Sequence, residues 1–123
     1  MNIGDIFTRK NISKLLGGSE VPFAPTKNGI VTCLCLDPER NPKAPEAVLP
    51  GTGRDIERMK DQVIEQKGPF PTFLKRKVNE WEFVGYFYVT GYSIDSQMID
   101  NYYKDCKTPR DQVTAIIWMK QKM

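Results

Sequence analysis

A proline-rich segment, PERNPKAPEAVLPGTGRD, occupies residues 38–55, where a small domain would normally place a regular strand or helix. It contains Pro38, Pro42, Pro45 and Pro50, together with Gly51 and Gly53. Proline fixes its own φ and lacks an N–H, so this segment cannot continue a helix or a central strand. The same restriction reduces the entropy that the chain loses when the loop is ordered. We therefore expect a rigid crossover loop between a strand and a helix.

The composition is that of a single globular domain. With 123 residues, of which 40% are hydrophobic and 27% charged, the chain can bury one core, and no repeat or low-complexity tract divides it. No apolar run is long enough to cross a bilayer, and the N-terminal residues lack the apolar stretch of a signal peptide. We expect one domain spanning residues 1–123, a cytoplasmic location and no membrane partner.

Histidine is absent, which limits the chemistry that the chain can perform. Its absence removes the usual general base and the commonest zinc ligand. Cys33, Cys35 and Cys106 form an odd set without zinc spacing, which favours free thiols in a reducing compartment. No carboxylate pattern typical of a nuclease is present. We expect no metal site, no cofactor and no enzymatic activity.

The pattern of apolar residues and breakers predicts alternating helices and strands. Thr8 and Gly17 are expected to cap a short helix at about residues 9–16. A second helix is expected to follow the proline-rich loop, with Thr52 and Asp55 as its capping pair. The other expected elements are a central strand at 30–36, a hairpin of strands 69–77 and 78–94, a helix after Asp95 and a last strand at 112–121. This order predicts an α+β fold with a curved mixed or antiparallel sheet, or a pseudo-barrel, and flanking helices.

The strand at residues 80–90 carries most of the aromatic residues. Strict alternation would place one apolar set on a single face (Trp81, Phe83, Gly85, Phe87 and Val89), with Glu80, Glu82, Val84, Tyr86, Tyr88 and Thr90 on the other. Tyr86 and Tyr88 could then stack on a planar ligand such as a base, or they could pack under a helix. Gly85 indicates a bulge, a bend or a ligand that passes close to the backbone.

Basic residues lie near these aromatic residues in the sequence. Lys75, Arg76 and Lys77 form the densest cluster, and Arg54 and Arg58 are one helical turn apart. Basic groups near aromatic rings suit binding to single strands or flipped bases, because phosphates take the charge and bases take the ring faces. The amides of Gly51, Thr52 and Gly53 could hold an anion before a helix. The alternative is that the lysines are solvated surface residues that protect an edge strand.

Three segments together resemble one family. The segments NPKAPEAVLPGTG, PFPTFLKRK and NEWEFVGYFYV, followed by the closing strand QVTAIIWMK, resemble PUA-like domains. They are nearest to the SRA-like modules of modification-dependent restriction endonucleases. The matching residues are Asn41, Pro42, Pro45, Gly51, Pro71, Phe73, Lys75, Trp81, Glu82, Phe83, Gly85 and Tyr86.

The resemblance implies a pseudo-barrel that recognises a modified base in DNA, namely methylated cytosine. The base would be flipped into an aromatic pocket, for which Trp81, Phe83, Tyr86 and Tyr88 are the candidates. Asn41, Asn79 and Asp37 are the candidates for hydrogen bonds to the base edge. The family often fuses this module to a nuclease, for which this chain has no room. A stand-alone module, a subunit that recruits a nuclease, or a module whose ligand has changed is therefore expected.

Three alternatives remain open. Other PUA-like domains bind RNA, so an RNA-binding module is the first. A small nucleotide-binding protein that uses the glycine turn and Arg54 is the second. A protein-interaction subunit, in which the tyrosine face meets another chain, is the third.

Overall fold

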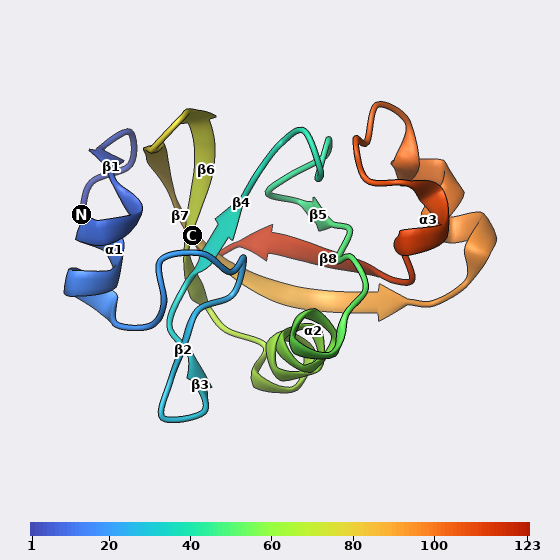
Figure 1. Ribbon diagram of the computed structural model, residues 1–123, viewed down its shortest axis with the longest axis horizontal. Coiled ribbons are helices and arrows are strands. Elements are labelled where there is room, and N and C mark those ends of the chain that lie inside the picture. Colours follow the sequence, from blue (N-terminus) through green and yellow to red (C-terminus); the bar gives the residue numbers. More distant parts are fainter.

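The computed structural model describes residues 1–123 and contains three α-helices, one 3₁₀ turn and eight strands (Figure 1). In chain order the elements are β1 (Ile6–Phe7), α1 (Arg9–Leu16), β2 (Thr26–Lys27), β3 (Ile30–Val31), β4 (Leu34–Leu36), β5 (Ala47–Val48), α2 (Arg54–Gln66), β6 (Phe70–Lys77), β7 (Glu80–Ser93), α3 (Ser96–Tyr103), η1 (Arg110–Gln112) and β8 (Ile116–Gln121). The longest helix, α2, has 13 residues, and no helix combines the length and apolarity needed to cross a membrane.

Six of the strands form one mixed sheet. Its order is β4–β6–β7–β8–β5, with β1 paired to the first part of β7. Only β4 and β6 run parallel, because α2 lies in the crossover between them; the other pairs are antiparallel. The α+β class with a mixed sheet is therefore confirmed. The edge strands β4 and β5 do not pair with each other, so the sheet does not close into a barrel.

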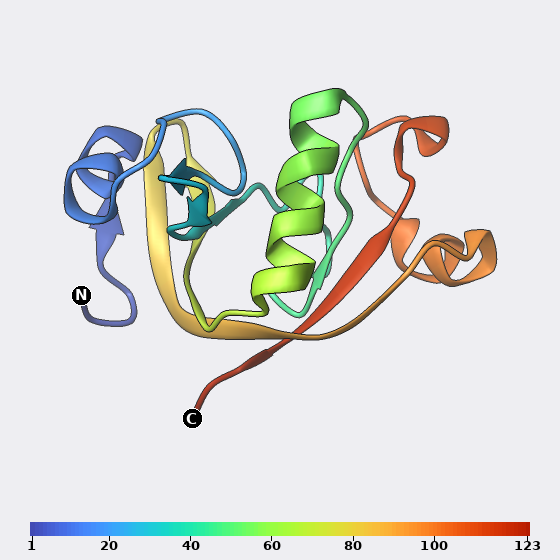
Figure 2. The ribbon, with the colours of Figure 1, turned by 90° about the horizontal axis from the view of Figure 1, so that it is seen from below.

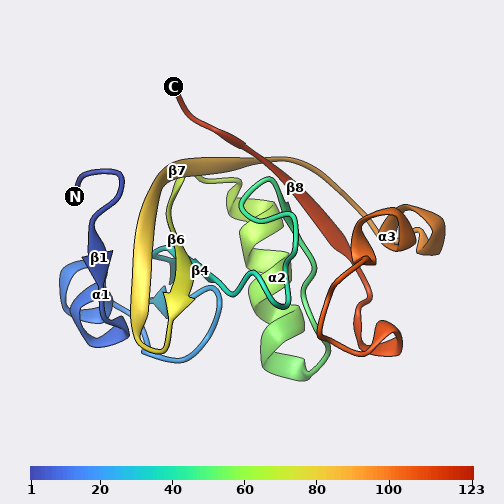
Figure 3. The same ribbon diagram turned by 90° about the horizontal axis from the view of Figure 1, so that it is seen from above.

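The sheet bends sharply along β7, with α2 on the concave side and α1 on the convex side (Figures 2 and 3). Thr72 pairs with Gly85 but Phe73 pairs with Phe83, so Val84 is an extra residue on β7 and forms a bulge. Gly85 permits the bulge because its φ is +118°, a conformation that other residues rarely adopt. The bulge and bend, one of the expected explanations for this glycine, are confirmed.

The bulge corrects the expected faces of the strand at 80–90. Trp81 and Phe83 pack in the cluster beneath α1, whereas Phe87 packs in the cluster beneath α2. Tyr86 contacts Phe83 edge to face, with 5.6 Å between ring centroids, so it lies on the α1 side of the sheet. Strict alternation is therefore wrong beyond Val84, because one inserted residue exchanges the two faces of a strand.

Three buried clusters pack against the sheet. Cys33, Cys35, Phe73, Trp81 and Phe83 form the convex cluster with Ile12 of α1. The concave cluster joins the sheet to α2 and contains Leu34, Leu36, Val48, Val63, Phe70, Phe87 and Ile117, among others. A third cluster packs α3 against β5 and β8 through Ala47, Leu49, Ile99, Val113 and Ile116. The β4–β6–β7 part of the sheet is therefore covered on both faces, which explains why the sequence of β4, LCL, is apolar throughout.

The strand expected at 30–36 is divided and is not central. Its first part, β3, belongs to the hairpin around Asn28 and Gly29, and its second part, β4, is an edge of the main sheet. Both faces of β4 are buried, one in the convex cluster and the other in the concave cluster, and the 19–25 segment covers its free edge. There the amide of Cys35 donates to the carbonyl of Phe23 at 2.8 Å. An apolar pattern records burial and cannot distinguish a covered edge strand from a central one.

The proline-rich loop contains a strand that the sequence did not indicate. Ala47 and Val48 form β5, which pairs with β8 and supplies the second edge of the sheet. A run of two residues between prolines is too short to show alternation, so β5 depends on its tertiary partner. The loop thus crosses from one edge of the sheet to the other.

The helix ends are confirmed at α1 and partly wrong at α2. Thr8 caps α1 by accepting a hydrogen bond from the amide of Asn11, and Gly17 follows the last turn. At α2 the N-cap is Gly53, with no side-chain hydrogen bond, so the expected capping pair of Thr52 and Asp55 does not form.

Candidate functional site

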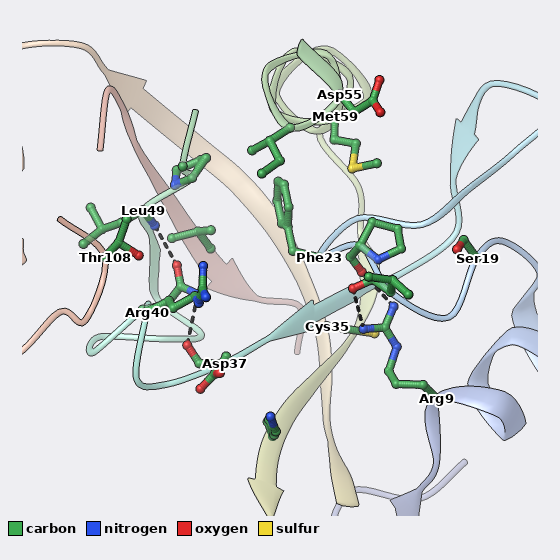
Figure 4. Close-up of a pocket in the computed structure, with 18 of the residues that line it drawn as sticks. Arg9, Ser19, Phe23, Cys35, Asp37, Arg40, Leu49, Asp55, Met59 and Thr108 are labelled. Carbon is green, nitrogen blue, oxygen red and sulfur yellow. Dashed lines mark hydrogen bonds between the residues drawn. The ribbon is translucent and has the colours of Figure 1, made fainter. Parts of the chain in front are cut away.

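A cavity of about 720 Å³ lies where the sheet is open, between the end of β4, β5 and the first turns of α2 (Figure 4). The 19–23 segment, the first residue of α1, β6 and β7 complete its wall. The two edges of the sheet fail to meet here, so the fold leaves a hollow that the proline-rich loop borders. Five of the residues expected to bind ligand line it, namely Asp37, Asn41, Gly51, Lys75 and Trp81.

One part of the cavity wall is apolar. It consists of Phe23 from the 19–23 segment, Ile56 and Met59 from α2, and Val48 and Leu49 from β5 and its end. Phe23 is half-buried, and Figure 4 shows it at the centre of the view, between α2 and β4. Its position is fixed by the bond from Cys35 to its carbonyl. This part of the wall offers a ring and aliphatic groups to a planar ligand.

The Asn41 side chain connects two parts of the proline-rich region by hydrogen bonds. It is buried, its Nδ2 donates to the carbonyl of Asp37 at 3.1 Å, and its Oδ1 accepts from the amide of Leu49 at 2.8 Å. The side chain therefore joins the two ends of the loop that borders the cavity. Both polar ends of the amide already have partners, so the structure gives Asn41 a role in shaping the cavity wall.

Arg9 lines the cavity from the start of α1, next to the 19–23 segment and Trp81. Its guanidinium donates to the carbonyls of Val21 at 3.2 Å and Pro22 at 2.7 Å, and it lies over the Trp81 ring with 5.1 Å from Cζ to the ring centroid. Only 9% of the residue is exposed, and its Nε has no hydrogen-bond partner. No carboxylate lies within ion-pair distance of it. Arg9 is therefore a buried positive charge without a counterion.

Two more cations lining the cavity also lack an ion-pair partner. These are Arg40, in the loop, and Lys75, on β6. Of the two carboxylates of the wall, Asp55 pairs with Arg58 at 3.3 Å, whereas Asp37 forms no ion pair and accepts the amide of Glu39 at 2.9 Å. The free polar groups of the cavity are thus mainly positive, which favours an anionic ligand.

The N-terminus of α2 reaches the same cavity. The first intrahelical bond runs from the amide of Glu57 to the carbonyl of Gly53 at 2.9 Å, so the three preceding amides have no helical partner. Gly51, Asp55 and Ile56, at this end, line the cavity. The helix dipole adds a partial positive charge on that side.

The two buried thiols next to Arg9, Cys33 and Cys35, have shifted pKa values. A hydrogen bond between them lowers the pKa of Cys33 and raises the pKa of Cys35. At Cys33, burial opposes this shift, whereas the Thr32 hydroxyl and the charge of Arg9 lower the pKa further. The same charge acts to lower the pKa of Cys35, which lines the cavity. Arg9 therefore makes this end of the cavity electropositive.

The other expected contact residues lie outside the cavity. They are Thr52, Gly53, Arg54, Arg58, Arg76, Lys77, Asn79, Phe83, Tyr86 and Tyr88. Arg76 is paired with Glu82 at 2.7 Å, and the Asn79 side chain accepts from the amide of Arg9 at 3.2 Å. Phe83 is buried between Phe73 and Tyr86. The expected aromatic pocket of Trp81, Phe83, Tyr86 and Tyr88 is therefore not assembled around the cavity.

Among the cavity residues that the sequence did not single out are Arg9, Phe23 and Arg40. Phe23 stands between prolines in the stretch VPFAP, and an aromatic residue held rigidly in a loop is a usable signal for a binding surface. Arg9 gave no such signal, because its neighbours in sequence are ordinary surface residues of a short helix. Its burial depends on the 19–23 segment folding back over it.

Comparison with protein-family models, with curated proteins and with solved structures found no match for this chain. The geometry of the cavity therefore has to support any functional assignment, together with the resemblance of the short sequence segments.

Proposed function

We propose that this protein is a DNA-binding domain that recognises a modified base, of the 5-methylcytosine type, by taking the flipped base into the cavity between β4, β5 and α2. The observation that carries the proposal is the division of this one cavity into an apolar part and a part with unpaired cations. A nucleotide has the same division, because its base is planar and weakly polar and its phosphate is charged.

The size and lining of the cavity support the proposal. Its volume of about 720 Å³ falls within the range of ligand sites, roughly 300–1,000 Å³. Phe23, Met59 and Ile56 would contact the base faces and an added methyl group, and such contacts return part of the cost of unstacking. The ring that stacks on the base would be Phe23, since the Trp81 ring is covered by Arg9.

The charges support binding to a polyanion. Arg40 is exposed at the cavity and Lys75 is half-buried in its wall, and neither forms an ion pair. The net charge is +3, so the attraction to DNA would come from these placed groups more than from the total charge. Any cleavage of the DNA would be supplied by a separate nuclease subunit.

Binding to a panel of duplexes tests the proposal. Matched duplexes carrying one cytosine, 5-methylcytosine or 5-hydroxymethylcytosine would be titrated with the full chain at two salt concentrations. We expect tighter binding to a modified duplex, by about tenfold or more, with affinity that falls as salt rises. Equal and negligible binding to all duplexes would contradict the proposal, and tighter binding to RNA of the same sequence would replace DNA by RNA as the ligand.

A free mononucleotide is the second candidate ligand, favoured by one observation. The cavity is large enough for a whole nucleotide and is bordered by the rigid loop, as in a small-molecule site. A mononucleotide that raises the melting temperature, while every oligonucleotide in the panel leaves it unchanged, would favour this function.

A further inference from the structure

We propose that Arg9 and Lys75 form a phosphate subsite at one end of the cavity. The inference rests on the proposed function, because the phosphate is that of the nucleotide whose base enters the apolar part. It adds Arg9, which neither the sequence pattern nor the resemblance singles out, to Lys75, one of the basic residues expected to contact phosphate.

The first argument is the uncompensated charge of Arg9. A buried charge without a counterion is unfavourable unless hydrogen bonds or a ligand compensate it. The two carbonyl acceptors compensate Arg9 in part, but they are neutral, and Nε remains without a partner. An anion in the cavity would supply the missing negative charge.

The second argument is that Arg9 is held in place before any ligand arrives. It is the first residue of α1, directly after the Thr8 cap, and its guanidinium is fixed by two carbonyls and by the Trp81 ring. A side chain that is already immobilised loses little entropy on binding, so its contact with an anion contributes more to affinity. Figure 4 shows the guanidinium directed towards the 19–23 segment, beside Cys35.

The third argument is the position of Lys75. Lys75 is paired across the strands with Trp81, the residue whose ring lies beneath Arg9. Directly paired residues on neighbouring strands have Cβ atoms about 5 Å apart. Both cations line the same cavity and neither forms an ion pair. Asp37, which follows β4 next to Lys75 of β6, also lines the cavity and offsets part of their charge, and a bound anion would offset the rest.

A phosphate fits this pair of cations. Guanidinium and ammonium groups are the side chains that bind phosphate through charge-assisted hydrogen bonds. Arg9, Lys75 and Phe23 line the same cavity, so a base and its phosphate could bind in it together.

Titration with deoxycytidine 5′-monophosphate and with deoxycytidine tests the subsite. We expect the monophosphate to bind the full chain at least about tenfold more tightly than the nucleoside, as one lost charge-assisted contact implies. Lys75→Gln should remove most of this difference. Lys77→Gln is the matched control, since Lys77 is an exposed lysine on the same strand outside the cavity, and it should leave the difference unchanged.

Arg9→Gln should remove the same difference, and its melting temperature must be measured because Arg9 also holds the 19–23 segment. Lys75 makes no hydrogen bond or ion pair, so Lys75→Gln decides the question even if Arg9→Gln unfolds. The subsite would be overturned if the monophosphate failed to bind, or if monophosphate and nucleoside bound equally. It would also be overturned if Lys75→Gln and Lys77→Gln lost the same affinity for the monophosphate.

The outcomes separate this inference from the proposed function. A modified duplex that binds wild type and Lys75→Gln with equal affinity would leave the function standing and overturn the subsite. Binding of the monophosphate that depends on Lys75, without binding to any duplex, would establish the subsite and contradict the DNA-binding function.

Discussion

Replacement of Phe73 by alanine is expected to lower the free energy of unfolding by about 3–5 kcal/mol, as for other fully buried aromatic residues. Phe73 is completely buried on β6, and its ring contacts Phe7 with 5.7 Å and Phe83 with 5.5 Å between centroids. It occupies the middle of the cluster that contains Cys35 and Trp81, both part of the cavity wall. Its loss would leave a void behind that wall which the surrounding strands cannot fill.

Urea denaturation would measure the effect. Val78→Ala is the matched control, because Val78 is 87% exposed in the β6–β7 turn and its truncation should change the free energy by no more than about 0.5 kcal/mol. A loss below about 1 kcal/mol for Phe73→Ala would contradict the packing described for the convex face of the sheet.

Truncation of Phe23 is expected to weaken binding to the modified duplex by about 1–3 kcal/mol, the range measured for the loss of one stacked ring. The same change at Tyr86 should alter the affinity by less than about twofold, because Tyr86 lies outside the cavity. Titrations of Phe23→Ala and Tyr86→Ala under identical salt conditions would compare the two.

Phe23 also packs against the core, so its variants need a stability control. Phe23→Leu keeps an apolar side chain and removes only the ring face, so a loss of affinity without a loss of melting temperature would identify stacking. If truncation of Tyr86 or Tyr88 weakened binding and truncation of Phe23 did not, the base would instead bind on the face of β7 that carries the tyrosines.

Local sequence signals predicted those parts of the fold that local energetics decide. Thr8 and Gly17 bounded the first helix correctly, since a cap and a terminator act within one turn. The β6–β7 hairpin was also predicted, because Asn79 adopts the positive φ that its tight turn needs. The two-residue strands β1 and β5 could not be predicted, since they exist only through pairing with β7 and β8.

The faces of β7 show how one residue limits such predictions. Gly85 signalled a bulge, but the sequence did not show which neighbour was the extra residue. Since Val84 is that residue, Tyr86 moved to the face that carries Phe83, away from the concave side. Trp81, on that same face, lines the cavity, whereas Tyr86 and Tyr88 do not, although each aromatic residue was identified correctly as belonging to a strand.

The candidate site was only partly predictable, because distant segments assemble it. The proline-rich loop led to Asn41 and Gly51, both of which line the cavity, and the basic cluster led to Lys75. Arg9 and Phe23 could not be placed there from the sequence, since the 19–23 segment reaches the cavity only by covering the edge of β4.

The central claim is that the ligand enters the cavity bordered by the loop, and Gly51→Leu tests it most directly. A β-carbon at Gly51 would have no neighbour closer than 3.9 Å, and the φ of Gly51 is not positive, so a leucine can be accommodated without backbone strain. Thr52→Leu is the matched control, because the exposed Thr52 adjoins the cavity without lining it.

The affinity of each variant for the modified duplex would be measured beside its melting temperature. The account predicts more than about a tenfold loss for Gly51→Leu alone, with both variants folded, since Gly51 lines the cavity and a leucine adds volume at its wall. Unchanged affinity in a folded Gly51→Leu protein would contradict it.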